Sequence, residues 1–192
     1  MYKFNSDGGL RVDRPADNLD EFTFDFIKVL RKHCHYSLVG GFLAIALGRS
    51  RSTEDVDMYI PRITKPAFLA LYKDLTDCGF WCLNAESGET VFGYLKDNIG
   101  IRFAKKGMAI PNIELKFVRD SLDEACLEDT FKLFVGRCEF IFSSLEMNIA
   151  FKRFYLKSQK DIEDATHIEM VFKGRIDQNK IDKYKRLIAR SR

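Results

Sequence analysis

Two predicted strands, joined by a glycine turn and a short helix, constrain the fold of this chain more than any other feature. Residues 36–39 are expected to form a buried strand, followed by the glycine pair 40–41. The apolar residues 42–47 have helical potential, and residues 56–60 read as a second strand. The second strand carries two carboxylates one residue apart.

Two aspartates precede and enter that second strand. Alternation along a strand places Asp55 and Asp57 on the same face, close enough to bind shared divalent cations. Gly40 and Gly41, which have no side chains, allow a phosphate to approach backbone N–H groups at the start of the short helix. A phosphate cradle beside carboxylates that bind metal is the chemistry of nucleotidyl transfer.

A third acid is expected on another strand of the same sheet. In residues 113–117, Glu114 alternates with apolar residues and therefore leaves the apolar face of its strand. A carboxylate there is predicted to point toward Asp55 and Asp57, and three acids suit two Mg²⁺ ions and an activated hydroxyl. The alternative is that Glu114 faces solvent.

The remaining pattern predicts a mixed α/β (α+β) fold, with a sheet flanked by helices in residues 1–142 and a helical appendage in residues 143–192. The run of strands without intervening helices excludes a regular doubly wound sheet. Helices are expected at 18–32, 64–78, 144–154, 162–172 and 181–188, and further strands at 80–83, 90–95, 99–104, 113–118, 132–135 and 139–142.

Composition is that of a soluble globular protein: 192 residues, 46% hydrophobic and 31% charged. No apolar run is long enough to cross a bilayer, and the first ten residues are too polar for a signal peptide. Five cysteines without a CxxC pair argue for reduced thiols rather than a disulfide framework. We therefore expect a cytoplasmic protein with no membrane partner.

The end of the chain, residues 173–192, is rich in lysine and arginine and contains only two acids, Asp177 and Asp182. A basic segment of this kind can neutralise nucleic-acid phosphates. It can equally be the solvated face of a terminal helix, which is the interpretation we favour.

The segment from Leu38 to Tyr59 resembles the nucleotidyltransferase superfamily in the spacing of its glycine pair and its acidic pair. More narrowly, it is similar to the AbiEii/AbiGii toxin group of abortive-infection and toxin–antitoxin systems. Residues 151–153 resemble the lysine-bearing helix of that group, and residues 160–164 resemble its Lys-Asp…Asp element. The resemblance spans roughly residues 36–165.

This resemblance implies a role for each matching residue. Asp55, Asp57 and Glu114 would be the catalytic acids, binding two Mg²⁺ ions, and Glu114 would also help to deprotonate the acceptor. The residues expected at the nucleotide are Gly40, Gly41, Arg49, Arg51, Ser52, Lys152 and Asp161.

The resemblance implies transfer of a nucleoside monophosphate from an NTP to a hydroxyl of RNA, such as a tRNA end, or of a protein. As a toxin, the chain would have a cognate antitoxin. Phe42 and Glu114 depart from the residues usual in the group. They motivate an alternative, a catalytically degraded module that binds a nucleotide or a partner. A further alternative is that the acids are solvated strand ends in an unrelated α/β domain.

Overall fold

A single mixed sheet organises the molecule. The computed structural model describes residues 2–4 and 9–190, and within these residues nine strands pair into one sheet. The strands are β1 (Tyr2–Phe4), β2 (Leu10–Val12), β3 (Ser37–Val39), β4 (Asp55–Ile60), β5 (Phe80–Cys82), β6 (Ile101–Lys105), β7 (Asn112–Phe117), β8 (Thr130–Val135) and β9 (Cys138–Ser143).

The sheet order is β1-β2-β8-β9-β3-β4-β7-β6-β5. At its centre β3 runs antiparallel to β4 and parallel to β9, and β4 runs parallel to β7. The β4–β7 register pairs Asp57 with Glu114 and Tyr59 with Lys116. Paired residues on neighbouring strands point to the same face, so the register sets these side chains beside one another.

Helices cover both faces of the sheet. Within the described residues they are α1 (Asn18–Leu30), α2 (Phe42–Ala46), α3 (Lys65–Asp77), α4 (Gly88–Lys96), α5 (Ser121–Glu128), α6 (Leu145–Ala150), a π-helical turn η1 (Phe151–Leu156), α7 (Gln159–Val171) and α8 (Gln178–Arg190).

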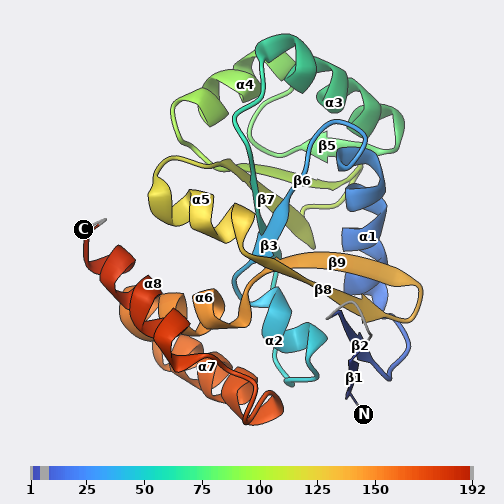
Figure 1. Cartoon of the computed structure of the whole chain (residues 1–192). Coiled ribbons are helices and arrows are strands. Elements are labelled where there is room, and N and C mark those ends of the chain that lie inside the picture. Colours follow the sequence, from blue (N-terminus) through green and yellow to red (C-terminus); the bar gives the residue numbers. More distant parts are fainter. Residues whose placement is uncertain (1, 5–8, 191–192) are drawn as a thin grey trace.

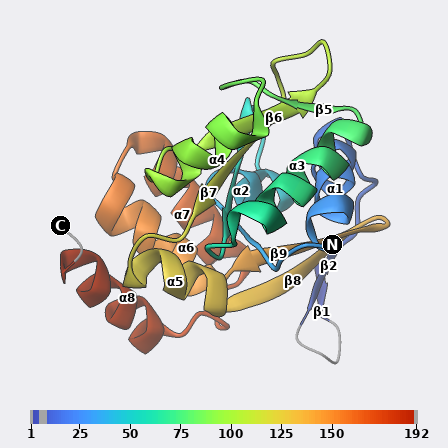
Figure 2. The same cartoon turned by 90° about the horizontal axis from the view of Figure 1, so that it is seen from above.

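The helices form two groups on opposite sides of the central strands. In Figure 1, α1 lies on one side and α6, α7 and α8 on the other, and Figure 2 shows the same separation from above. On the α1 side Phe26 packs edge-on against Phe80, with ring centroids 5.3 Å apart, and against Phe103 at 5.7 Å. The predicted mixed α/β sheet flanked by helices is confirmed.

Local sequence explains where several helices begin. The Asp17 side chain accepts hydrogen bonds from the backbone N–H groups of Leu19 and Asp20, and this caps α1. Thr64 caps α3 in the same way, and Ser144 and Ser158 cap α6 and α7. The helices predicted from residue 18 and from residue 64 are therefore present.

The strand predicted at residues 90–95 is wrong, because these residues belong to helix α4. Val91 and Leu95 are its buried residues, and their spacing of four is that of a helix. Helix α5, capped by Asp120, was not predicted, and nor were the three-residue strands β1 and β2.

The C-terminal helices pack on one another and on the sheet domain. Helix α6 contacts both α7 and α8, while α2 contacts α7 and α5 contacts α8. A domain boundary after residue 142 stays a prediction. Across residues 2–4 and 9–190, no helix has the length and apolar character needed to cross a bilayer.

Candidate functional site

Two of the three predicted acids lie side by side and share one cation. The Lys116 ammonium lies 2.9 Å from Asp57 Oδ1 and 2.5 Å from Glu114 Oε2. Arg102 Nη2 donates to the other oxygen of Glu114 at 2.7 Å. Glu114 therefore faces Asp57 rather than solvent, as the strand alternation predicted.

Asp55 stands slightly apart from this pair. It lies two residues before Asp57 on β4, and its carboxylate accepts a hydrogen bond from Thr53 Oγ1 at 3.2 Å. In the part of the chain that is described, no three acidic, histidine or cysteine side chains converge closely enough to hold a metal ion. The structure thus brings Asp57 and Glu114 together but does not gather all three acids into one cluster.

The shared lysine sets the electrostatics of the pair. Burial raises the pKa of Asp57 above its ordinary value, although the attraction of Lys116 acts in the opposite direction. Burial also acts to raise the pKa of Glu114, but contacts with Lys116, Asp57 and Arg102 outweigh it and hold that pKa below the usual value. The pKa of Lys116 is raised because the two carboxylates outweigh its own burial.

The predicted glycine turn lies directly against Asp57. Gly40 has a φ of +81°, and a Cβ atom at this position would come within 2.6 Å of Asp57 Oδ2. At Gly41 a Cβ atom would come within 2.8 Å of Arg51 Nη2. Gly40 therefore leaves room for the Asp57 carboxylate, and Gly41 leaves room for the Arg51 guanidinium.

Phe42, the departure noted after the glycine pair, points into the core. Its side chain is buried and packs against Phe140 and Phe142, with ring centroids 5.3 and 5.6 Å apart. Of the three residues of the turn, only the glycines border the site. Phe42 therefore changes the packing of the core beneath the glycine turn. It does not change the side of the turn that faces Asp57.

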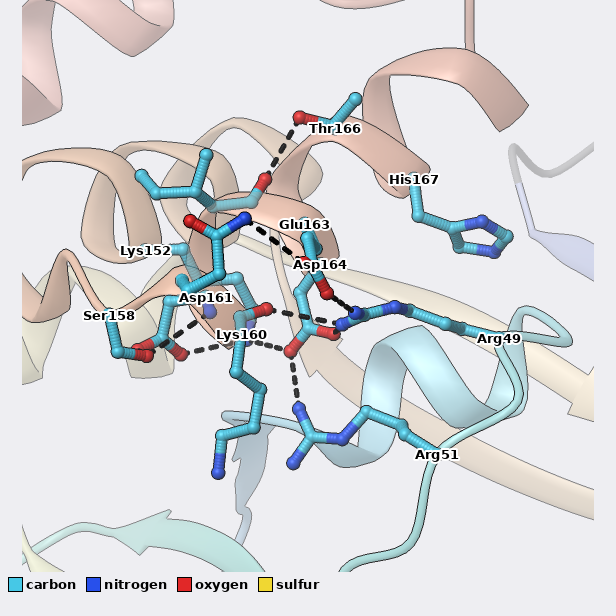
Figure 3. A network of polar contacts seen from close by, with 12 residues as sticks. Arg49, Arg51, Lys152, Ser158, Lys160, Asp161, Glu163, Asp164, Thr166 and His167 are labelled. Carbon is cyan, nitrogen blue, oxygen red and sulfur yellow. Dashed lines mark hydrogen bonds and ion pairs between the residues drawn. The ribbon is translucent and has the colours of Figure 1, made fainter.

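A second cluster of charge is centred on Asp164 of α7 (Figure 3). This carboxylate is fully buried and accepts hydrogen bonds from Arg49, from Arg51 Nη1 at 2.6 Å and from Lys152 Nζ at 2.9 Å. Arg49 also contacts Glu163. Two arginines of the loop before β4 are thus fixed to the C-terminal helices.

Lys152 lies on the π-helical turn η1, and its side chain is only 2% exposed. Its ammonium is 3.8 Å from Asp161 Oδ1, and Asp161 also contacts Ser158, the cap of α7. Lys152 and Asp161 therefore lie together, and their expected place at the nucleotide stays a prediction. Ser52 is exposed and contacts Arg51 through its carbonyl oxygen.

A cavity of about 310 Å³ opens beside the carboxylate pair. The turn and the sheet contribute Gly40, Asp57 and Lys116 to its wall, and η1 contributes Lys152 and Tyr155. It contains both polar and apolar lining residues, which is typical of a small-molecule site. Gly40, Asp57, Lys116 and Lys152, which are predicted or newly found site residues, thus line one cavity.

Sequence reasoning missed Lys116, and it gave no role to Asp164, although Asp164 ends the Lys-Asp…Asp element at residues 160–164. The signal for Lys116 was its position two residues after Glu114, which places it on the same face of β7. The signal for Asp164 was its position three residues after Asp161 on a helix, where side chains neighbour one another.

The fold is that of known nucleotidyltransferase-like structures. One is the solution structure of the antibiotic-resistance factor ANT(2'')-Ia, with 13% identity, a TM-score of 0.57 and coverage of 90% of this chain and 92% of that one. ANT(2'')-Ia crystallised with adenylyl-2''-tobramycin gives 11% identity, a TM-score of 0.57 and coverage of 91% and 99%.

A third similar structure is an antigenic nucleotidyltransferase-like protein from Paracoccidioides brasiliensis. It has 16% identity and a TM-score of 0.56, over 93% of this chain and 90% of that one. No protein-family model and no curated protein sequence matches the chain. At these identities the likeness extends to the fold, and the function has to be argued from the site.

Proposed function

We propose that the protein transfers a nucleoside monophosphate from an NTP to a hydroxyl group of an acceptor. The observation that carries this proposal is the single cavity that joins the glycine turn to Asp57, Lys116 and Lys152. A polyphosphate needs bare backbone and cations, and an attacking hydroxyl needs a carboxylate. Gly40, the two lysines and Asp57 supply these groups in the wall of one cavity.

The donor set fits Mg²⁺ bound together with a nucleotide. Mg²⁺ is usually held by one or two carboxylates together with substrate phosphates and water. Asp57 and Glu114 already converge on one positive charge, the Lys116 ammonium, and Asp55 lies on the same strand. These three acids would hold the ion, which would neutralise charge on the phosphates and promote attack by the acceptor hydroxyl.

The chain itself supplies positioning and charge. Gly40 lets bare backbone lie against Asp57 in the wall of the cavity, and Lys152, whose ammonium is bonded to Asp164, lines the same cavity. Glu114 accepts the proton of the attacking hydroxyl. Arg51, held by Asp164, keeps its guanidinium against Gly41 and fixes the turn.

Two comparisons bear on the chemical class of the acceptor. The resemblance to AbiEii/AbiGii toxins favours an RNA or protein hydroxyl, a toxic activity and a cognate antitoxin. The structural neighbour ANT(2'')-Ia was crystallised with adenylyl-2''-tobramycin, a modified small molecule. We propose RNA or protein as the acceptor. The experiment below also includes a small polyhydroxylated compound as a possible acceptor.

One observation favours a second function, a non-catalytic module that binds a nucleotide or a partner. Lys116 already bridges Asp57 and Glu114, so the carboxylate pair has a cation without any metal. A module of this kind would bind NTP without releasing pyrophosphate.

The test incubates the protein with each α-³²P-labelled NTP, Mg²⁺ and, in separate arms, total RNA, total protein or an aminoglycoside. We expect label in one acceptor class and a loss of about 100-fold or more in the Asp57→Asn variant. Asp25→Asn, which changes a half-exposed aspartate on α1, is the matched control and should label normally. Nucleotide binding without transfer would support the module, and neither binding nor transfer would contradict both functions.

A further inference from the structure

Lys116 occupies the position at which two acids of the site would otherwise attract a divalent cation. Its ammonium is within 2.9 Å of Asp57 and within 2.5 Å of Glu114, and these residues come from two strands held in fixed register. Two adjacent carboxylates without a counter-cation repel one another and attract cations. The lysine therefore supplies one positive charge to both acids in the protein without metal, and Arg102 supplies a second one to Glu114 alone.

Of the three side chains, Lys116 and Asp57 are partly exposed, whereas Glu114 is only 14% exposed. Lys116 is 33% exposed and Asp57 28%, and both line the cavity. A Cβ atom at Gly100 would lie 3.1 Å from Lys116 Cε, so the lysine chain packs closely against this glycine on one side while its other side borders the cavity. The ammonium is thus a tethered cation at the edge of an open space.

We propose that Lys116 is a resident counter-cation that makes divalent-metal binding conditional on the nucleotide. This inference rests on the proposed function for the identity of the ligand. In the free protein the ammonium and a divalent cation compete for Asp57 and Glu114, so the cation binds weakly. When a nucleotide enters the cavity its phosphates add negative charge, which accommodates both the ammonium and the ion.

Coupling between two ligands is reciprocal, which gives the proposal a measurable form. If Lys116 opposes the metal in the free protein, removing its charge strengthens metal binding there. The same removal reduces the gain in metal affinity that a nucleotide produces. A lysine with a purely structural role, tying β4 to β7, would lower stability and leave this coupling unchanged.

The experiment measures Mn²⁺ binding to the intact chain by electron paramagnetic resonance of the free ion, first without nucleotide. We expect Lys116→Met to bind Mn²⁺ about tenfold or more tightly than wild type, within the range common for coupled binding. Lys116→Arg, which keeps the charge, should bind like wild type, and so should Lys73→Met, which changes an exposed lysine on α3. Equal or weaker Mn²⁺ binding by Lys116→Met would overturn the proposal.

Two further variants keep the result decisive. Lys116→Gln removes the charge but keeps hydrogen-bond donors toward both acids, and it replaces Lys116→Met if that variant fails to fold. Adding Glu114→Gln to either one should cancel the gain in Mn²⁺ affinity, because only one carboxylate of the pair then remains. A gain that survives this second change would place the ion elsewhere and overturn the proposal.

Repeating the titrations with α,β-methylene-ATP separates this inference from the proposed function. We expect the nucleotide to tighten Mn²⁺ binding more in wild type than in Lys116→Met. If wild type transfers nucleotide but Lys116→Met gains no Mn²⁺ affinity, the inference fails and the proposed function stands. If Lys116→Met gains affinity but no nucleotide binds or is transferred, the proposed function fails, and Lys116 remains only a competitor for metal.

Discussion

Gly40 is the residue at which backbone conformation and site geometry depend on each other most directly. Its φ of +81° strains any residue with a side chain, and the space where a Cβ atom would stand is already filled by the carboxylate of Asp57. A substitution there therefore has two separable consequences, one for stability and one for the site.

We predict that Gly40→Ala lowers the free energy of unfolding by about 1–2 kcal/mol through the left-handed backbone alone. It should also displace Asp57 and abolish nucleotide binding. Gly79→Ala is the matched control, because Gly79 has a φ of +80° and nothing within 4 Å of an added Cβ. Urea unfolding and calorimetry measure the two effects, and nucleotide binding retained by Gly40→Ala would refute the contact with Asp57 as part of the site.

At the residue scale the sequence predicted the acids better than their partners. Alternation sufficed to place Asp57 and Glu114 on one face, because a strand has only two faces. Lys116 shares that face, but a lysine two residues from an acid is common on exposed strands. Its role depends on the β4–β7 register, which alternation does not specify.

The connection between α7 and the loop before β4 is the feature that matters most at the element scale. Asp164 is buried and bonded to Arg49, Arg51 and Lys152, so this carboxylate joins the C-terminal helices to the edge of the site. Removing one partner from a buried ionic network leaves the others uncompensated.

We predict that Asp164→Ala destabilises the protein by about 3–5 kcal/mol, because Lys152 would remain buried with only Asp161 near it. Glu163→Gln is the control on the same helix. Glu163 is 50% exposed and pairs only at the surface, so its loss should cost about 1 kcal/mol or less. Urea denaturation checks both values, and similar losses in the two variants would contradict a central role for Asp164.

Helix α8 should be attached in a pH-dependent way through Asp129. This carboxylate accepts hydrogen bonds from Lys180 at 2.8 Å and from the Tyr184 hydroxyl. Burial acts to raise the pKa of Asp129, but these contacts and Ser144 together lower it. Because the folded pKa is depressed, the stability from these contacts is present above the unfolded value, about 3.9, and is lost as pH falls through the folded pKa.

The prediction is that Asp129→Asn costs about 1 kcal/mol at neutral pH and that this difference from wild type shrinks as the pH is lowered below about 4. Unfolding free energies at several pH values give the measurement. Asp77→Asn, at an exposed position on α3, should change stability by less than about 0.5 kcal/mol at neutral pH. A difference for Asp129→Asn that stays constant down to pH 2 would be inconsistent with this account.

Element by element, the long and strongly patterned segments were predictable and the short or ambiguous ones were not. The Asp17 cap and the helical spacing of the apolar residues predicted the bounds of α1 to within two residues. Residues 90–95 alternate as a strand would, but they also carry Val91 and Leu95 at helical spacing, and packing against β6 and β7 decides for the helix. Strands β1 and β2, at three residues each, are too short to show a period.

For the molecule as a whole, the sheet order was the part that the sequence left open. Strand β3 pairs with β9 through Leu38 and Phe142, two residues more than a hundred positions apart. Nothing local in either strand specifies a partner at that distance in the chain, since pairing is selected by the packing of the complete sheet. The mixed α/β class was nevertheless predictable, because it follows from the number and order of elements.

For the whole molecule, the proposed reaction is transfer of a nucleoside monophosphate from an NTP to an acceptor. Following the α- and γ-phosphates of the NTP separately tests this reaction most directly. The acceptor that becomes labelled would be incubated with the wild-type chain, Mg²⁺ and the NTP labelled either at the α- or at the γ-phosphorus. We expect the α-label to become attached to the acceptor and the γ-label to be released as pyrophosphate, and we expect Asp57→Asn to show neither. A γ-label found on the acceptor or released as inorganic phosphate, or equal transfer by Asp57→Asn, would contradict the proposed reaction.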